Sequence, residues 1–149
     1  MQKEITQRTV LGIIEPVAFP ELGVAEVSAK IDTGAYSGAI HCEVIEEVLD
    51  ATTGKKVLKV VPIDTTHKPV IIERYAKVAA RSSTGHISQR YIATTKIIIQ
   101  GKEYDIRIGL TKRTMMNMKV LVGRRFLRKN AILVDVTLNQ EFDNDGGRK

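Results

Sequence analysis

The sequence has few cysteines and few aromatic side chains. Cys42 is the only cysteine, tryptophan is missing, and aromatic residues make up 5% of the 149 residues. A single cysteine cannot form an intramolecular disulfide, so the stability of the fold does not require an oxidising compartment. The shortage of aromatic rings, which stack on the bases of single-stranded nucleic acid, argues against a nucleic-acid-binding protein.

The sequence also lacks long apolar segments. It contains no run of roughly eighteen or more apolar residues, the length that a helix needs to cross a bilayer. Its first residues, Met1 to Glu4, do not show the basic and then apolar layout of a signal peptide. We therefore expect a soluble, cytoplasmic protein with no membrane partner.

The composition favours one compact unit with a positive charge. The chain is 43% hydrophobic and long enough for one buried core, which predicts a single domain over residues 1–138. Residues 139–149 are polar, and we expect them to be disordered. The net charge of +6 favours acidic partners. Among these we rank an acidic peptide above nucleic acid, because no base-reading motif accompanies the charge.

Short β-rich segments between turn signals predict an all-β barrel or sandwich. In segment 104–110, apolar residues alternate with polar residues or glycine, so one face of this strand should belong to the core. Residues 82–85 and 100–102 carry hairpin-turn signals, and one short helix is expected at 124–129. The predicted strands are 8–14, 24–31, 57–63, 70–80, 87–99, 104–110 and 131–136.

The strand at 24–31 leads directly into Asp32-Thr33-Gly34-Ala35, which places a carboxylate on a tight turn at a strand end. Glycine permits unusual backbone conformations and the close approach of another group, and backbone N–H groups of the turn can hold the carboxylate. The Thr33 hydroxyl is positioned to bond across to a neighbouring backbone. Taken alone, such a turn is more often a surface turn than a catalytic one.

A second feature of the sequence favours the catalytic interpretation of this turn over that of a surface turn. The apolar residues Val120, Leu121 and Val122 end at Gly123, and a short helix-like segment follows. A strand ending in Asp-Thr-Gly-Ala, a long hairpin with glycine near its tip, and an apolar run with glycine before a short helix together resemble the retropepsins. The resemblance spans about residues 8–136. It implies a closed β-barrel of the retropepsin (acid protease) type with one short helix near the C-terminus.

The chain is more closely similar to a bacterial and archaeal family that carries the name ATP-dependent zinc protease. Some members of that family are linked to ATP-grasp ligases that add glutamates to protein ends. The resemblance implies an aspartic peptidase, with glutamate-tailed proteins as candidate substrates and an ATP-grasp ligase as a candidate partner that uses the ATP. The residues that carry it are Lys30 to Ala35, Ser37, Ile40, His41, Leu110 to Arg113, Met116 and Val120 to Leu127.

The resemblance also assigns roles to individual residues. It makes Asp32 the catalytic residue. The alternatives are a structural histidine for His41 and a solvated basic face for Arg124. The other assignments are Thr33, Gly34 and Ala35 in the active-site turn, Tyr36, Ser37, Gly85 and His41 in substrate binding, and Val122, Gly123 and Arg124 in support of the turn.

An aspartic peptidase needs two carboxylates that share a proton, so that one activates water while the other protonates the scissile carbonyl. No second Asp-Thr-Gly or Asp-Ser-Gly occurs in the sequence. The second carboxylate must therefore come from another chain. We expect a two-fold homodimer with the Asp32 residues of both subunits at its centre.

The sequence does not favour a metal site or another cofactor. It contains three histidines and no His-Glu-x-x-His motif. In an extended segment, the adjacent residues His41 and Cys42 face opposite sides and cannot bind one ion together. Cys42 is expected to be a small buried apolar residue.

Two other functions are compatible with the sequence. The first is a non-catalytic retropepsin-like domain that binds peptides or forms dimers. The second is a basic RNA-associated or ribosome-associated protein, which only the net charge supports.

Overall fold

The computed structural model describes residues 8–81, 83–112 and 117–139. Strands account for most of these residues, with one 3-10 helix, η2 (Pro20–Leu22), and one α-helix, α1 (Arg124–Lys129). The strands are β1 (Val10–Leu11), β2 (Ile14–Phe19), β3 (Val24–Asp32), β4 (Gly38–Leu49), β5 (Lys56–Pro62), β6 (Val70–Ile72), β7 (Tyr75–Arg81), β8 (Ile87–Ile99), β9 (Lys102–Thr111), β10 (Val120–Gly123) and β11 (Leu133–Val134).

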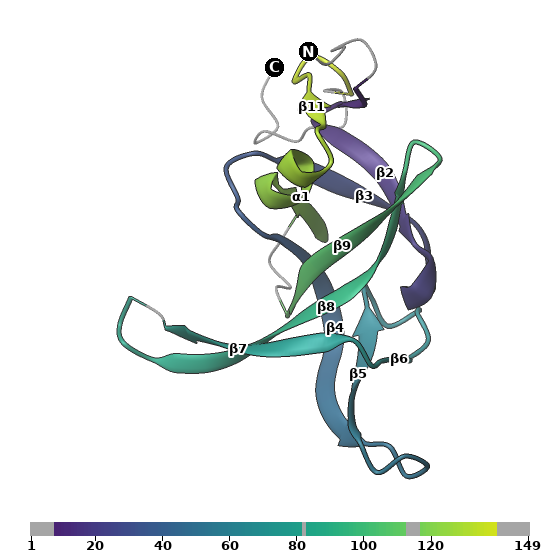
Figure 1. Ribbon diagram of the computed structural model, residues 1–149, viewed down its shortest axis with the longest axis vertical. Coiled ribbons are helices and arrows are strands. Elements are labelled where there is room, and N and C mark those ends of the chain that lie inside the picture. Colours follow the sequence, from purple (N-terminus) through teal and green to yellow (C-terminus); the bar gives the residue numbers. More distant parts are fainter. Residues whose placement is uncertain (1–7, 82, 113–116, 140–149) are drawn as a thin grey trace, which may run out of the picture.

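Six strands close a ring in the order β10, β3, β2, β8, β9 and β4, because β10 pairs with both β3 and β4. The strands β5 and β6 extend the sheet beyond β4, and β7 pairs with the outer part of β8 (Figure 1). The prediction of a closed, retropepsin-like β-barrel with one short helix is confirmed.

The core of the barrel receives at least one fully or almost fully buried apolar side chain from every strand of the ring. Burying an aliphatic side chain contributes roughly 1.5–3 kcal/mol. The alternation predicted for segment 104–110 is confirmed, because the apolar residues of β9 from Ile106 onward are 4% exposed or less. Representative core residues of the six strands are Val17, Ala29, Ile40, Ile97, Ile108 and Val120.

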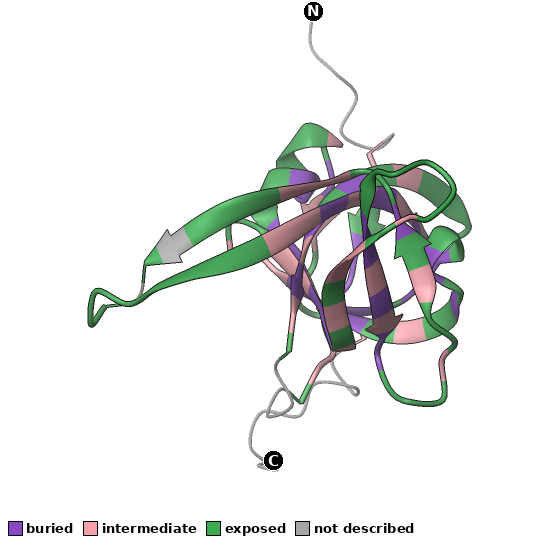
Figure 2. Ribbon diagram, turned by 90° about the horizontal axis from the view of Figure 1, so that it is seen from below, coloured by how far each residue is buried: buried purple, intermediate pink, exposed green. Residues whose placement is uncertain are grey.

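The hairpin of β7 and β8 forms an arm that extends away from the barrel (Figure 2). Gly85 lies in its turn at φ +87°, and Ile87 beside the turn is 56% exposed. The second predicted hairpin turn is also found. Gln100 and Gly101 both have positive φ, which is the requirement of a two-residue turn between β8 and β9.

The strand β4 was missed by the sequence prediction. Its first half is covered on both sides, so that Ile40, His41 and Cys42 are all fully buried and no alternation is visible. Its second half leaves the barrel as a hairpin with β5 and carries charged residues such as Glu46. Neither half therefore shows the period of two on which strand prediction rests.

Three predicted strands were wrong in their extent. Segment 8–14 divides at Gly12, whose N–H donates to Glu15 Oε2, so that β1 pairs with β11 and β2 pairs with β3. Segment 70–80 divides before Tyr75, because β6 pairs with β5 whereas β7 pairs with β8. Of segment 131–136, only Leu133–Val134 is a strand, since Asp135 turns the chain by accepting the Thr137 N–H.

The helix predicted at 124–129 is found with the same bounds. In the part of the chain that the structure describes, no helix has the length and apolar character to span a membrane. All but the first residue of the tail predicted at 139–149 lies outside the described residues.

Candidate active site

The Asp32 carboxylate is held on a tight turn at the end of β3. Its Oδ1 accepts a hydrogen bond from the Gly34 N–H at 2.9 Å, and its carbonyl oxygen accepts one from the Ala35 N–H at 3.2 Å. Gly34 does not adopt the positive φ that would favour glycine, so the prediction of an unusual backbone conformation was wrong. Glycine is favoured here because of the limited space, since a Cβ at this position would lie 3.2 Å from Asp32 Oδ1.

The strand β10 lies between β3 and β4, the two strands that flank this turn. It is parallel to β3, with Val122 opposite Ile31 and Gly123 opposite Asp32. A Cβ at Gly123 would lie 2.7 Å from Tyr36 O, which explains why the predicted close passage requires glycine here. Gly38 is a second position of this kind that the sequence reasoning missed, since its Cβ would lie 2.5 Å from Leu121 O.

The start of α1 fastens the loop that follows the turn. The N–H groups of Arg124 and Arg125 donate to the carbonyl oxygens of Ala35 and Tyr36 at 2.8 and 3.0 Å. The Arg124 side chain reaches back to the turn itself, where Nη1 donates to Gly34 O at 3.2 Å. Arg124 therefore contacts the turn, as the resemblance to the retropepsins implied, and it remains exposed to solvent at the same time.

One face of the turn points away from its own barrel. Thr33 and Gly34 are exposed, whereas Asp32 is half-buried. Among the described residues, none forms a hydrogen bond with the Thr33 hydroxyl. The barrel side of the turn is thus held by contacts with its own chain, whereas the other side is exposed to solvent.

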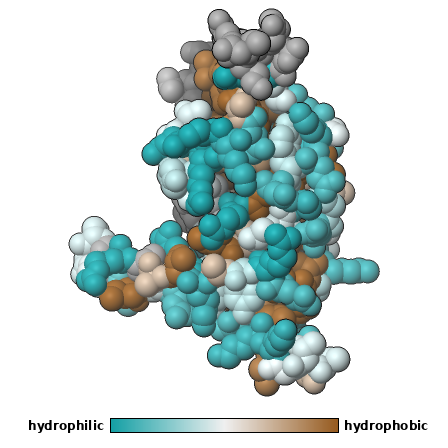
Figure 3. Space-filling view, in the orientation of Figure 1, coloured by the Kyte–Doolittle hydropathy of each residue, from teal (hydrophilic) through white to brown (hydrophobic). Residues whose placement is uncertain are grey.

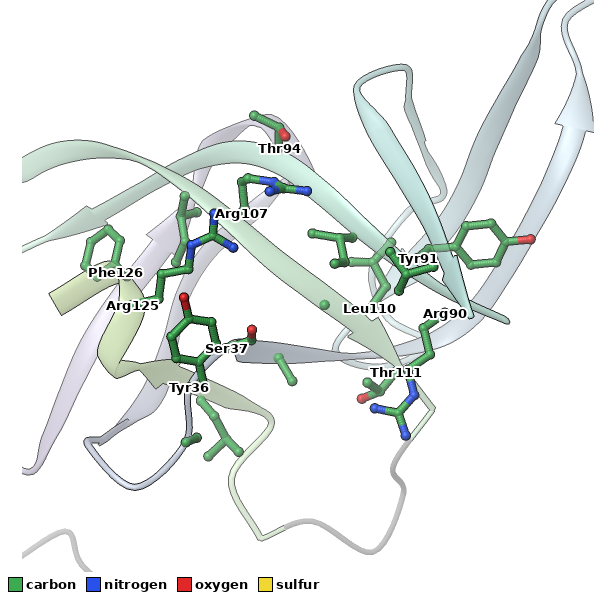
Figure 4. Close-up of a pocket in the computed structure, with 18 of the residues that line it drawn as sticks. Tyr36, Ser37, Arg90, Tyr91, Thr94, Arg107, Leu110, Thr111, Arg125 and Phe126 are labelled. Carbon is green, nitrogen blue, oxygen red and sulfur yellow. The ribbon is translucent and has the colours of Figure 1, made fainter. Parts of the chain in front are cut away.

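A groove of about 1050 Å³ begins directly beside the turn and runs along β8 and β9 (Figure 4). Ala35, Tyr36 and Ser37 form its near end. From β9, Arg107 and Gly109 line it, and the buried residues Ile106 and Leu110 also reach it. From α1 it receives Arg125, Phe126 and Lys129.

The lining of this groove is strongly basic. Asp105 is the single acidic residue among the described residues that line it. Lys96, hydrogen-bonded to Asp105, lowers the pKa of that carboxyl, so Asp105 is charged and already paired. The basic residues of the lining are Arg74, Arg90, Arg107, Lys112, Arg125 and Lys129.

The structure brings together only some of the residues predicted for substrate binding. Tyr36 and Ser37 line the groove next to the turn. His41 does not line it, since it is fully buried and its Nε2 lies 2.6 Å from Glu43 Oε2. This placement agrees with the structural alternative stated for His41. Gly85 lies in the turn of the arm and also does not line the groove.

Cys42 lies in the core, as predicted. Burial raises the pKa of its thiol to about 12, so the thiol is neutral over the physiological range and is not activated as a nucleophile. Within residues 8–81, 83–112 and 117–139, no three His, Cys, Asp or Glu side chains are grouped so that they could hold a metal ion.

Comparison with known protein families identifies the chain. The family model described as "RimB-like: Retropepsin-like aspartic endopeptidase RimB" matches residues 10–143. The chain belongs to the RimB-like family. This result agrees with the family to which the sequence motifs pointed.

Curated relatives of this RimB-like chain are much longer proteins. The chain is 32% identical over 130 residues to a probable alpha-L-glutamate ligase from Shewanella halifaxensis, with 85% of this chain aligned. A second probable alpha-L-glutamate ligase, from Desulfotalea psychrophila, is 26% identical over 140 residues. The matches span 28% and 29% of those two proteins, so the chain corresponds to less than a third of their length.

A solved structure shares the fold of this RimB-like chain. It is the crystal structure of a protein with unknown function from Legionella pneumophila, with a TM-score of 0.69 and 26% sequence identity. The alignment covers 87% of this chain and 95% of that chain.

Proposed function

We propose that the chain is an aspartic peptidase of retropepsin type whose active site forms between two copies of the chain. The observation that carries the proposal is the Asp32 turn, in which the Gly34 N–H orients the carboxylate and the barrel side is held by β10 and α1. The open face of the turn, with Thr33 and Gly34 exposed, is where a second copy would bring its own Asp32.

The chemistry requires both carboxylates. Two carboxylates at short distance share one proton, because they cannot both ionise. The ionised one takes a proton from water, which attacks the scissile carbonyl carbon, while the protonated one gives its proton to the carbonyl oxygen. The chain holds no second Asp-Thr-Gly turn, so symmetry supplies the partner carboxylate.

The arm on the outer surface supports an assembly of two copies. The arm of β7 and β8 extends beyond the barrel of its own chain (Figure 2). It carries the exposed apolar residues Val78 and Ile87, and Figure 3 shows apolar atoms on this arm and hydrophilic side chains over α1. Such an arm would gain apolar contacts by covering a bound peptide or a second subunit.

We propose glutamate-rich protein tails as the substrate. The basic lining of the groove beside the turn supports an acidic peptide. The relatives that contain this domain within a longer chain are named probable alpha-L-glutamate ligases, which supports a substrate built from glutamate. The peptidase would then act on the product of a ligase partner, in the cytoplasm, and would itself use only water.

The competing function is a peptide-binding or dimerisation domain without catalysis. It would keep the groove and the barrel but would not need an oriented carboxylate on the turn. The Asp32→Asn variant separates the two, because Asn keeps the size of the side chain but cannot act as a base. We expect this variant to fold and dimerise like the wild type.

The first test is mass spectrometry of peptides incubated with wild type and with Asp32→Asn at several pH values. Half of the peptides carry a C-terminal oligoglutamate tail, and the others carry oligoglutamine of equal length. We expect cleavage by wild type alone, with a preference for the glutamate tail. Equal cleavage by both proteins, or by neither, would contradict a peptidase that depends on Asp32.

A mixing experiment tests the shared site. Asp32→Asn protein in excess should form mixed dimers that hold one Asp and one Asn, so the activity per wild-type subunit should fall. The control is an equal excess of an unrelated inert protein. Sedimentation measured at the assay concentration completes the test, because an active, strictly monomeric enzyme would exclude the proposed dimer.

A further inference from the structure

One end of the groove combines two arginines with an aromatic ring, and each comes from a different element. Tyr36 follows the active-site turn, Arg107 lies on β9, and Arg125 lies on α1. In Figure 4 Arg125 extends beside Tyr36 and Arg107 lies on the same side of the groove, near Thr94, whereas Arg90 extends at the Thr111 end. Two cationic groups are therefore present within the same end of one cavity.

The backbone brings both arginines to the groove. Arg107 is an exposed residue of β9 between Ile106 and Ile108, which are 4% and 0% exposed, and it lines the groove. The Arg125 N–H donates to Tyr36 O at 3.0 Å, and the Arg125 guanidinium carbon lies 6.0 Å from the centre of the Tyr36 ring. A change of the loop after the turn would therefore also move Arg125.

Among the described residues, no acidic side chain forms an ion pair with either arginine. The ion pairs among the described residues use Lys77, Lys96, His41 and His67 and no arginine. The single described carboxylate of the groove, Asp105, is paired with Lys96. A guanidinium group binds carboxylates through two parallel N–H donors, so these two arginines offer a place for an acidic group from outside.

We propose that Arg107 and Arg125 form a subsite that binds an acidic side chain of the substrate close to the scissile bond. The subsite is close to that bond because Asp32 is the last residue of β3 and Tyr36 lies in the short connection, residues 33–37, that follows it. This inference rests on the proposed peptidase function and assigns its preference for acidic substrates to two residues. The ligand is a Glu or Asp side chain in an extended peptide.

The test compares matched peptides that carry either Glu or Gln at the residues next to the cleaved bond. Wild type should cleave the Glu peptide with the higher kcat/KM. In Arg107→Gln and in Arg125→Gln, this Glu-to-Gln ratio should fall by about tenfold or more, with the larger loss on the Glu peptide. The loss should be mainly in KM, since both residues bind a side chain that does not react.

Arg128→Gln is the matched control. Arg128 lies on the same short helix, is exposed and is not part of the groove lining, and its substitution removes the same charge. If the preference came only from long-range attraction by the net charge, this control would lower the ratio as much as the two groove variants. That result would overturn the proposed subsite.

A binding measurement separates this inference from the proposed function. Fluorescence anisotropy follows labelled pentaglutamate and pentaglutamine on wild type, on Arg107→Gln and on Arg125→Gln. Cleavage with an unchanged Glu-to-Gln ratio in both variants overturns the subsite and leaves the peptidase in place. If wild type cleaves no peptide but binds pentaglutamate through both arginines, the subsite stands and the peptidase fails. If wild type binds neither peptide and its cleavage shows no preference, the subsite is overturned.

Discussion

Arg124 Nη1 lies 3.2 Å from the carbonyl oxygen of Gly34, so the first residue of α1 holds the turn that carries Asp32. The same side chain lies 5.4 Å from the centre of the Tyr36 ring, measured from its guanidinium carbon. One cation therefore connects the Asp32 turn with the near end of the groove. Its backbone N–H, which donates to Ala35 O, adds a third contact.

We expect Arg124→Ala to lower kcat/KM by about tenfold or more with a loss of stability near 1 kcal/mol, because the contact is exposed. The kcat/KM of Arg124→Lys should lie between those of wild type and Arg124→Ala. A lysine ammonium can approach one carbonyl oxygen but cannot stack on the Tyr36 ring in the same way. Amide hydrogen exchange at Gly34 and Ala35 reports on the turn itself. Unchanged exchange in Arg124→Ala would show that the side chain does not position the turn.

The close contact between Gly38 and β10 predicts a large effect of one methyl group. In Gly38→Ala, the new Cβ would lie 2.5 Å from Leu121 O, so the strands must separate at the site. We expect a loss of about 1–3 kcal/mol in the free energy of unfolding. Urea denaturation measures it, with Gly109→Ala as the control, because a Cβ there would lie 3.4 Å from Gly38 O. Equal stability of the two variants would contradict the close approach of β4 and β10.

Burial of Cys42 predicts a dependence of stability on alkaline pH. Its pKa is raised from 9.0 to about 12 in the folded chain. Between these values the unfolded chain loses the thiol proton while the folded chain keeps it, so the free energy of unfolding falls as pH rises. The fall approaches about 1.4 kcal/mol per pH unit above 9. Urea midpoints at pH 8 and pH 10 should therefore drop further in wild type than in Cys42→Ala.

The base of the arm contains a tyrosine with an unusual titration. The Tyr75 hydroxyl donates to Glu47 Oε2 at 2.6 Å, and this bond is the main reason why the pKa of Tyr75 is raised to about 12. In Glu47→Gln the acceptor is no longer charged, so the pKa should move back toward 10. Absorbance at 295 nm follows the titration while circular dichroism confirms that the fold persists. If the part of the absorbance change that occurs near pH 12 remained in Tyr75→Phe, it could not be assigned to Tyr75.

The parts of the fold that the sequence predicted are those with local signals. The alternation in segment 104–110, the turn at Gly101 and the helix Arg124–Lys129 each depend on neighbouring residues. The Asp-Thr-Gly turn was recognisable for the same reason. The strand β4 was missed because tertiary contacts bury it on both sides, which removes the pattern that marks a strand.

The groove was not predictable from local patterns. Arg107 and Arg125 are far apart in the sequence and share a cavity only because β9 and α1 both border the loop after Asp32. The net charge pointed to acidic partners but could not say where the charge gathers. The buried Glu15 is a similar case, since two of its donors, Gln100 and Asn139, come from distant segments.

The position of β10 between β3 and β4 has a consequence for synthesis of the protein. Val120–Gly123, which pairs with both strands that flank the Asp32 turn, leaves the ribosome roughly ninety residues after that turn. Until then β3 and β4 lack the strand that pairs with both of them, and the ring of strands cannot close. Because such distant pairing is slow and forms late, a nascent chain is expected to carry its carboxylate without a working site. The proposed peptidase activity would therefore begin only after almost the whole barrel has been translated.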